Sequence, residues 1–336
     1  MSDEKQPVVF VGFDDGYAEC KLFFSNGLTS RTPSRARPGA MKTVSLSRKN
    51  PKSFGYEAGG QAFTAGDIRD PTPTTFDEYP FSAMNRVIVA HALRMSGIDP
   101  DSQLVMCTGL PIKKYYRGMD MNKDYISKKR KNLLLNDVES KDGAQLPLIK
   151  HHYVGCEGVL AWVDMVIERG DDGKLSFNAD IANERIAIVD IGGRTTDIAF
   201  IDGGDLDFDR SDTIEEGMLS IKMDLKSLIH RSHGVEMDMT ELDRAVETGY
   251  VRIMGEQVDV SKEVEGAKEG PIQRIHAAVQ RLVGQGNPDR VLFVGGTTAA
   301  CENQIEGWFP NQHIAEEPAF ANARGACKNA EMMYLR

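Results

Sequence analysis

The chain begins with two apolar runs that are separated by two acidic residues and a glycine. Residues 8–24 read VVFVGFDDGYAECKLFF, so the apolar character stops at Asp14, Asp15 and Gly16 and then resumes. Asp-Gly between two apolar runs is a strong signal for a tight turn that joins two strands. The pattern therefore predicts a β-hairpin, and a turn alone would account for the two carboxylates.

The same arrangement returns in the second half of the chain. Residues 186–204, IAIVDIGGRTTDIAFIDGG, again have an Asp at the end of an apolar run, a Gly two residues later and a charged residue seven residues later. A repeat at this spacing predicts two related halves, each of which opens with a hairpin. The corresponding residues are Asp14 and Asp190, Gly16 and Gly192, and Lys21 and Asp197.

Apolar residues at helical spacing follow both hairpins, and short apolar runs lie between them. The predicted helices cover 80–97, 157–170, 218–234 and 271–284, and two further strands cover 103–111 and 290–296. This mixture predicts an α/β protein whose sheets are covered by helices, in two lobes with a cleft between them. We expect residues 30–52 to form an inserted subdomain and residues 170–180 to link the lobes.

Composition limits the classes of function. The chain has 336 residues, of which 41% are hydrophobic, and it has no apolar run of membrane-spanning length and a polar N-terminus, so we expect a cytoplasmic protein with a large core. The net charge of −10 disfavours direct binding to nucleic acid, so any connection to DNA should run through a partner. Five widely spaced cysteines without a C-x-x-C pair predict reduced core thiols.

Two basic patches contrast with this acidic composition. One is the series of basic residues between Arg31 and Lys52, and the other is the run SKKRK at 127–131. The favoured interpretation is a solvated loop and a solvated helix face. The alternative is contact with an acidic partner or a neighbouring subunit.

The two hairpin turns have the residues that a magnesium–triphosphate group requires. Glycine in a tight turn lets backbone N–H groups approach phosphate, and carboxylates suit magnesium. We therefore expect Asp14 and Asp190 to face the metal, and Lys21 to reach a phosphate as a point charge. The expected phosphate contacts are Gly16, Tyr17 and Ala18 on one side and Gly192, Gly193, Arg194, Thr195 and Thr196 on the other.

A third glycine element lies at residues 293–308, where FVGG ends a strand and opens a helix. Gly295, Gly296 and Thr297 would there place bare backbone and a helix N-terminus beside the nucleoside and its α-phosphate. The chain contains neither G-x-x-x-x-G-K-[S/T] nor a G-x-G-x-x-G that opens a helix after a strand. A P-loop enzyme and a Rossmann dehydrogenase are therefore poor fits.

Five motifs in order resemble those of the actin superfamily, and most closely those of the ParM/StbA actin-like plasmid-segregation ATPases. They are FDDGYAECKL, CTGLPIKKYY, VDIGGRTTDIAF, VLFVGGTTAACENQI and AFANARGACKNA. The resemblance covers nearly the whole chain. It implies an actin-like ATPase fold, an α/β fold of two lobes, each built on a duplicated ribonuclease H-like sheet with flanking helices, with the nucleotide in the interlobe cleft.

The same resemblance implies domain boundaries and further site residues. Domain I would comprise 1–178 and 319–336 with an insertion at about 31–79, and domain II would comprise 179–318 with an insertion at about 218–268. Glu157 is similar to the glutamate that positions the attacking water, although a glutamate favoured by the dipole of the following helix is an equal alternative. Glu216 and Gly217 resemble contacts to the nucleoside, and Lys222 is a further candidate.

The resemblance implies an ATPase that uses Mg²⁺ and forms homopolymeric filaments for plasmid partition, with GTP left open as its nucleotide. A DNA-bound adaptor of the ParR type would be its partner, without membrane or direct nucleic-acid binding. A sugar-type kinase of the superfamily is the first alternative, but the chain has little room for its substrate-binding insertion. A chaperone-type ATPase would need a substrate domain, which we do not expect. A cell-shape actin homologue is set aside only by the closer match of the first two motifs.

Overall fold

The computed structural model describes residues 7–41, 53–68 and 70–336. By its contacts the chain separates into two compact units. Unit 1 consists of Met1–Ala179 and Phe320–Arg336, and unit 2 consists of Asp180–Ala319.

Unit 1 is built around a five-stranded sheet that contains the predicted first hairpin. From edge to edge the strands are β11 (Leu148–Cys156), β7 (Gln103–Leu110), β1 (Val8–Asp15), β2 (Glu19–Phe24) and β3 (Thr29–Pro33). β1 and β2 pair antiparallel, whereas β7 pairs parallel with both β1 and β11, as expected where helices connect strands.

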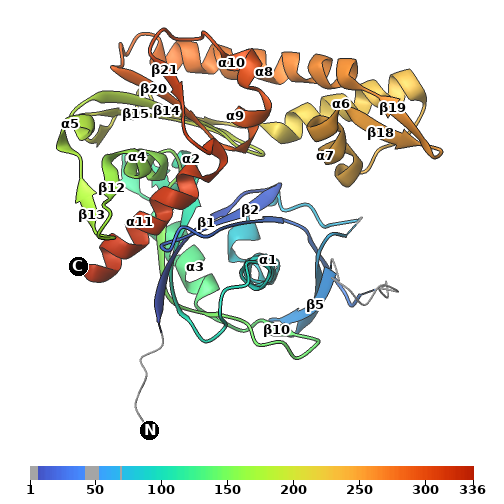
Figure 1. The fold of residues 1–336 in the computed structure, drawn as a ribbon, viewed down its shortest axis with the longest axis horizontal. Helices are drawn as coiled ribbons and strands as arrows, with labels where there is room; N and C mark the ends of the chain where they lie inside the picture. The colour runs from blue at the N-terminus through green and yellow to red at the C-terminus, as the bar shows by residue number, and fades with distance from the viewer. Residues whose placement is uncertain (1–6, 42–52, 69) are drawn as a thin grey trace. The chain divides into compact units, whose positions relative to one another are not determined.

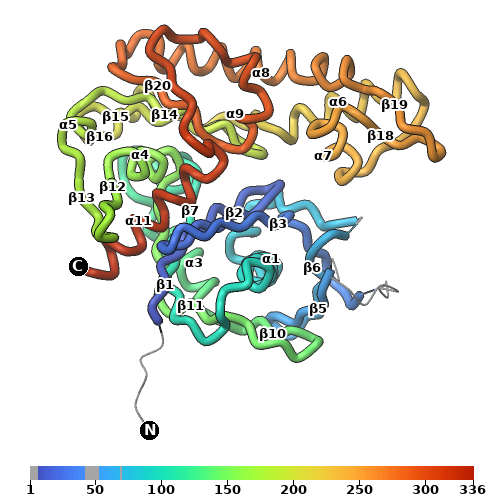
Figure 2. The backbone as a smooth tube through the Cα atoms, viewed as in Figure 1, coloured from blue at the N-terminus to red at the C-terminus, as the bar shows by residue number. Residues whose placement is uncertain are grey.

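Helices cover both faces of this sheet (Figure 1). The helices α1 and α3 lie on one face, and α4 and α11 lie on the other. Figure 2 shows the C-terminal helix running beside the first strand, although the two are at opposite ends of the sequence. The helices of unit 1 are η1 (Tyr79–Phe81), α1 (Ala83–Met95), α2 (Ile112–Tyr115), α3 (Lys123–Leu133), α4 (Val159–Val166) and α11 (Ala321–Leu335).

A second sheet of unit 1 packs on the other side of α1, so that this helix is buried between two sheets. Tyr56 and Phe63 from this sheet share one apolar core with Val87 and Ile88 of α1. Its strands are β10 (Glu139–Ser140), β5 (Ser53–Ala58), β6 (Gln61–Gly66) and β4 (Ala36–Pro38). Two small hairpins complete the unit, β8 (Tyr116–Arg117) with β9 (Asp120–Met121) and β12 (Ile167–Arg169) with β13 (Leu175–Phe177).

Unit 2 contains the second predicted hairpin in a sheet of its own. The register pairs Asp190 with Asp197 across this hairpin, as it pairs Asp14 with Lys21 in unit 1, so the repeated residues occupy equivalent positions. The strands are β16 (Asp205–Leu206), β15 (Thr196–Asp202), β14 (Arg185–Ile191), β20 (Arg290–Val294) and β21 (Gln312–Ile314), with β17 (Asp212–Ile214) also paired to β15.

The helices of unit 2 bury apolar stripes against this sheet and against one another. Ile221 and Leu225 of one helix and Ile272 and Ile275 of another belong to the same core as Val189 of the sheet. The remaining elements are α5 (Ala179–Ala182), α6 (Met218–His233), α7 (Met239–Thr248), β18 (Tyr250–Ile253), β19 (Glu256–Asp259), α8 (Ser261–Val283), α9 (Gly296–Ala300), α10 (Glu302–Ile305) and η2 (Pro318–Phe320).

Two predicted helix boundaries are wrong. The helix expected at 157–170 is shorter, because the chain changes into strand β12 at Ile167. The helix expected to start at Pro271 starts ten residues earlier, and Pro271 is buried inside α8. Among the described residues, no helix has the combination of length and apolar character that a membrane span needs.

The basic stretch 31–52 is only partly a solvated loop. Residues 42–52 lie outside the described part of the chain, but Arg31 belongs to β3, and Arg37 belongs to β4. Arg35 is only 8% exposed, and its guanidinium lies 3.6 Å from a carboxylate oxygen of Asp67. The expectation of a solvated side chain is therefore wrong for Arg35.

Candidate nucleotide-binding residues

The turn between β1 and β2 is held by Ser34, which follows β3, and lies beside Tyr79 of η1. Ser34, just after β3, donates a hydrogen bond of 2.5 Å from its hydroxyl to the carbonyl of Gly16, and its backbone N–H donates to the carbonyl of Ala18 (3.1 Å). The Tyr17 ring lies 6.5 Å from that of Tyr79. Residues 16–18 therefore form a turn that is stabilised by the hydrogen bonds of Ser34.

Asp14 and Lys21 face each other across this hairpin. The Lys21 ammonium donates to Asp14 Oδ2 at 2.9 Å, and Lys21 is only 8% exposed. Below the turn, burial raises the pKa of the Cys20 thiol and of the Tyr79 hydroxyl, so both groups stay neutral. The structure thus brings Asp14, Gly16 and Lys21 together at one end of the sheet.

A buried ion pair beside this turn was not predicted from the sequence. The Lys129 ammonium lies 2.9 Å from both carboxylate oxygens of Asp15 and also donates to the carbonyl of Gly109 (2.8 Å). The expectation that SKKRK is a solvated face is wrong for Lys129, which is only 2% exposed. The signal that could have found it is spacing, because Ile126, Lys129 and Leu133 share one helix face.

Glu157 lies against the end of β7. A Cβ atom on Gly109 would be 2.7 Å from Glu157 Cγ and 2.9 Å from Oε1, so only glycine leaves room for this side chain. Glu157 lies one residue before Gly158, the N-cap of α4, so it precedes the helix and is not part of its first turn. Gly158 has φ 76° and places Glu157 outside the helix.

In unit 2, three loops that are distant in sequence meet at the carbonyl of Gly192. This oxygen accepts hydrogen bonds from the Thr297 hydroxyl (2.7 Å) and the Met218 N–H (3.2 Å). Gly193 O accepts from the Leu219 N–H at 2.7 Å. A Cβ on Gly217 would lie 2.5 Å from Gly192 O, so glycine is required for this close approach. The predicted loops 192–196, 216–217 and 295–297 are therefore assembled in one place.

Asp190 is buried beneath this junction. It is 6% exposed, and a Cβ on Gly295, whose φ is 97°, would lie 2.4 Å from its Oδ1. The facing Asp197 is 1% exposed and accepts a hydrogen bond of 2.5 Å from the Thr213 hydroxyl. Burial of two facing carboxylates is costly, and a cation or hydrogen-bond donors must offset that cost.

Other predicted residues of unit 2 have hydrogen-bond or ion-pair partners within the unit. Thr196 donates from its hydroxyl to the Glu216 carbonyl at 2.9 Å, and the Glu216 carboxylate pairs with Arg274, which raises the pKa of that guanidinium. Arg194 lies 3.6 Å from Glu215. Lys222 is 4% exposed and pairs with Asp243, so its ammonium already has a carboxylate partner.

The donor set fits a magnesium ion that is held mainly by phosphate and water. No group of three or more His, Cys, Asp or Glu side chains able to hold a metal occurs in the described residues. Mg²⁺ on a nucleotide needs only one or two carboxylates, because waters and phosphate oxygens complete its coordination. Asp14 in unit 1 and Asp190 in unit 2 each provide a carboxylate of the kind that such an ion takes.

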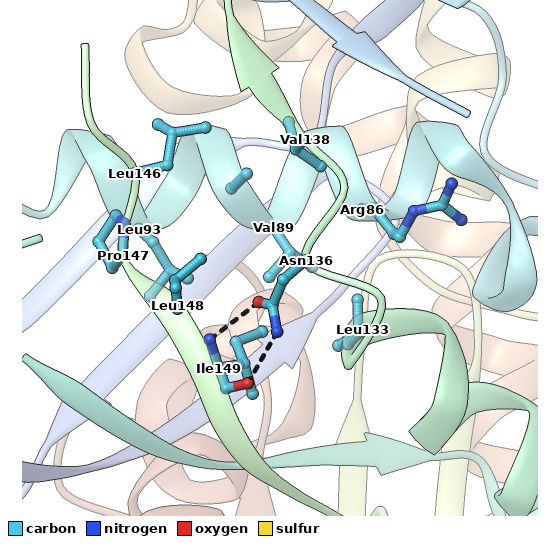
Figure 3. A pocket seen from close by; sticks show the side chains of 11 residues that line it. Arg86, Val89, Leu93, Leu133, Asn136, Val138, Leu146, Pro147, Leu148 and Ile149 are labelled. Atoms are coloured by element: carbon cyan, nitrogen blue, oxygen red, sulfur yellow. Dashed lines mark hydrogen bonds between the residues drawn. The ribbon is translucent and has the colours of Figure 1, made fainter. Parts of the chain in front are cut away.

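Unit 1 also contains a cavity, which is lined by residues outside the predicted loops (Figure 3). It measures about 30 Å³ and is lined mainly by apolar side chains of α1 and of residues 146–149. Asn136 borders it and bonds both the N–H and the carbonyl of Ile149 at 3.0 Å. Its volume suits about one water molecule, and none of the predicted nucleotide-binding residues lines it.

Comparison with protein families places the two parts of the chain in one superfamily. Residues 9–163 match the family model of the plasmid segregation protein ParM, N-terminal part, and residues 188–307 match that of the C-terminal part of the archaeal actin homologue MreB-like. Both models describe actin-like proteins, so each part of the chain is similar to that superfamily. The N-terminal match is to ParM, which confirms the resemblance expected from the motifs. A search of curated proteins gives no significant match.

Solved structures of actin-like proteins share the fold over the whole chain. The archaeal actin homologue Ta0583 is 20% identical over 97% of this chain and 100% of its own, with a TM-score of 0.75. ParM in a 15-stranded filament from Clostridium botulinum is 17% identical over 97% and 100%, with a TM-score of 0.75. Bacillus thuringiensis ParM with AMPPNP is 16% identical over 98% and 100%, with a TM-score of 0.66. The predicted actin-like ATPase fold is confirmed.

Proposed function

We propose that this protein is an ATPase that assembles into filaments with ATP and drives plasmid partition in the cytoplasm. The match of residues 9–163 to ParM carries this proposal. The filament and AMPPNP complex of ParM relatives and the ADP complex of Ta0583 support self-assembly and nucleotide binding. A DNA-bound adaptor of the ParR type would connect the filament to the plasmid.

Each proposed chemical role rests on a residue type and its surroundings. Backbone N–H groups of the two hairpin turns and the 295–297 loop would bind the phosphates, and Asp14 and Asp190 would hold Mg²⁺, which neutralises charge on the transferring phosphoryl group. Glu157 would accept a hydrogen bond from the attacking water and orient it. The Lys21 ammonium would add positive charge beside the β1–β2 turn.

Hydrolysis tests the catalytic part of this proposal. Asp190→Ala should lower the ATPase rate at least about 100-fold, because charge on the phosphoryl group is then poorly neutralised. Asp205→Ala is a suitable control, because Asp205 is an exposed carboxylate in the same sheet. Wild-type hydrolysis by Asp190→Ala would remove Asp190 from the site.

A second candidate is a cytoskeletal actin homologue without a role in plasmid partition. The match of residues 188–307 to an archaeal MreB-like model and the likeness to Ta0583 favour it. The two candidates differ in the fate of a low-copy plasmid that carries this gene and its native flanking DNA. Deletion of the gene should raise plasmid loss per generation if it acts in partition, and should leave the loss rate unchanged if it is a general cytoskeletal protein.

A further inference from the structure

Lys129 spans the point where two parallel strands of unit 1 separate. The pairing of β1 with β7 ends at Phe13 and Thr108. The next residues of the two strands diverge, and the Lys129 ammonium bonds Asp15 on one side and the carbonyl of Gly109 on the other, at 2.8–2.9 Å. Ligands of open α/β sheets usually bind at such carboxyl ends of strands.

Each group that Lys129 holds is adjacent to a candidate functional residue. Asp15 lies between Asp14 and Gly16 of the first hairpin turn, and Gly109 is the residue against which the Glu157 side chain packs. An ammonium has three N–H donors, and the three acceptor oxygens here are two of Asp15 and one of Gly109. Lys129 therefore connects the turn to the backbone on which the Glu157 side chain packs, while Asn85 donates a further hydrogen bond of 3.3 Å to Asp15.

Stability alone is a poor explanation for this pair. The side chains of Lys129 and Asp15 are 3% and 5% exposed, so both charges have lost most of their water. A buried ion pair is often no more stabilising than apolar residues of similar volume, because desolvation offsets the Coulomb attraction. What an ion pair adds over apolar contact is direction, because hydrogen bonds fix both distance and angle.

We propose that Lys129 is a positioning residue for nucleotide hydrolysis, because its buried ammonium ties the Asp14–Gly16 turn to the Gly109 backbone on which Glu157 rests. This inference rests on the proposed ATPase function. It gives Lys129 no contact with the nucleotide. Loss of Lys129 should therefore misplace the water-orienting carboxylate relative to the phosphates and reduce kcat, with little effect on nucleotide affinity.

The experiment compares Lys129→Met with the double variant Lys129→Met/Asp15→Asn. The single variant leaves the Asp15 charge buried without its cation, and this can prevent folding. The double variant removes both charges and should restore cooperative thermal unfolding, but it still lacks the Lys129 bond to Gly109. We expect its kcat for ATP to fall at least about tenfold, whereas the Kd for a fluorescent ATP analogue should change less than about threefold.

Two controls separate positioning from general damage. Lys123→Met makes the same chemical change at an exposed position of α3 and should keep wild-type kcat. Asp15→Asn alone retains Lys129 as a donor to Gly109 but leaves the buried ammonium without its carboxylate, so its cooperative unfolding is measured first; when folded, it should have a kcat between those of the wild type and the double variant.

The possible results are distinct. A folded double variant with wild-type kcat would overturn the positioning role while the ATPase proposal stands. A parallel loss of nucleotide affinity and kcat, or a double variant that does not fold, would assign Lys129 to structure alone. Wild-type protein that binds ATP without hydrolysing it would overturn the ATPase proposal and the role of Lys129 with it.

Discussion

The Glu157 side chain packs directly on Gly109 at the end of β7. Its side chain occupies the space that a Cβ on Gly109 would need. Its backbone N–H donates a hydrogen bond of 2.8 Å to the carbonyl of Leu110, the last residue of β7. A carboxylate whose backbone is hydrogen-bonded to a strand end suits a group that orients water, because misplacement by about 1 Å can cost about 100-fold in rate.

Replacement of this carboxylate tests the proposed chemistry. Glu157→Gln should lower the ATP hydrolysis rate about 100-fold or more, since the amide cannot accept the water proton in the same way, while ATP binding stays within about threefold. Filaments formed with ATP should then persist longer, as seen by pelleting over time. Glu139→Gln, at an exposed position of β10, is the control. Normal hydrolysis by Glu157→Gln would return Glu157 to a packing role.

Two buried histidines make the stability of unit 1 depend on pH. Burial lowers the pKa of His91 from 6.5 to about 4 and that of His152 from 6.5 to about 3. Both are hydrogen-bonded when neutral, His91 to the Tyr56 hydroxyl at 2.9 Å and His152 to the Thr108 hydroxyl at 3.1 Å. Their contribution to the free energy of unfolding is complete above pH 6.5, the approximate pKa of histidine in the unfolded chain, and is lost as the pH falls below that value. The reason is that the unfolded chain then binds protons that the folded chain excludes.

The free energy of unfolding of unit 1 should therefore fall between about pH 6.5 and 5. The slope should approach two protons, which is about 2.7 kcal/mol per pH unit. Trp308→Phe leaves Trp162 as the tryptophan of unit 1, so urea unfolding followed by fluorescence reports on this unit. Adding His91→Gln should reduce the slope to one proton. If His91→Gln leaves the slope unchanged, His91 is not one of the two groups that make the stability of unit 1 depend on pH.

At the residue scale, local sequence predicted the glycines and acidic residues of turns but not the buried charges. Asp14 and Asp190 follow apolar runs, and this is visible in the sequence. Lys129 stands among exposed basic residues, and its partner Asp15 is 114 residues away, so no local pattern pairs them. The partner of Lys222, Asp243, was missed for the same reason.

At the scale of elements, the C-terminal helix α11 fixes unit 1 through glycine contacts. A Cβ on Gly325 would lie 1.7 Å from the Leu160 carbonyl oxygen of α4, and a Cβ on Gly12 would lie 1.7 Å from the Ala323 carbonyl oxygen. Backbone atoms cannot move as easily as a side-chain end. The helix therefore packs against α4 and β1 at a distance that only glycine permits.

Substitution of Gly325 tests this packing. Gly325→Ala should destabilise unit 1 by about 3 kcal/mol, because the helices must separate to admit the methyl group. Gly266→Ala is the matched control in α8, where the nearest atom to the added Cβ is Leu228 Cδ1 at 3.7 Å. It should stabilise unit 2 by about 0.5–1 kcal/mol through helix propensity. Urea unfolding followed by Trp162 and Trp308 separately measures both, and unchanged stability of Gly325→Ala would contradict the close packing.

Hairpins and apolar helices were predicted well, and helix ends were predicted less well. The β1–β2 and β14–β15 hairpins are present in the register that the repeated residues indicate. α8 extends before Pro271, because the apolar face of the helix is buried on both sides of the proline. The buried residues of this face include Val264, Ala267, Ile272 and Ile275. Apolar spacing in the sequence could not show whether burial outweighs the lost hydrogen bond.

At the scale of the whole molecule, the proposed function couples ATP hydrolysis to filament assembly. A filament former needs neighbouring subunits for activity, whereas a small-molecule kinase needs an acceptor. Nucleation of a polymer is less favourable than elongation, because each added subunit makes more contacts than the first pair. ATPase activity per molecule should therefore depend on protein concentration only if the chain assembles.

The most direct measurement is specific ATPase activity with light scattering across a series of protein concentrations, in ATP and in ADP. We predict that activity per molecule and scattering in ATP both rise above the same threshold concentration, and that ADP gives a higher threshold or none. Activity per molecule that stays constant across the series, with no scattering in ATP, would contradict the filament account and favour the kinase alternative.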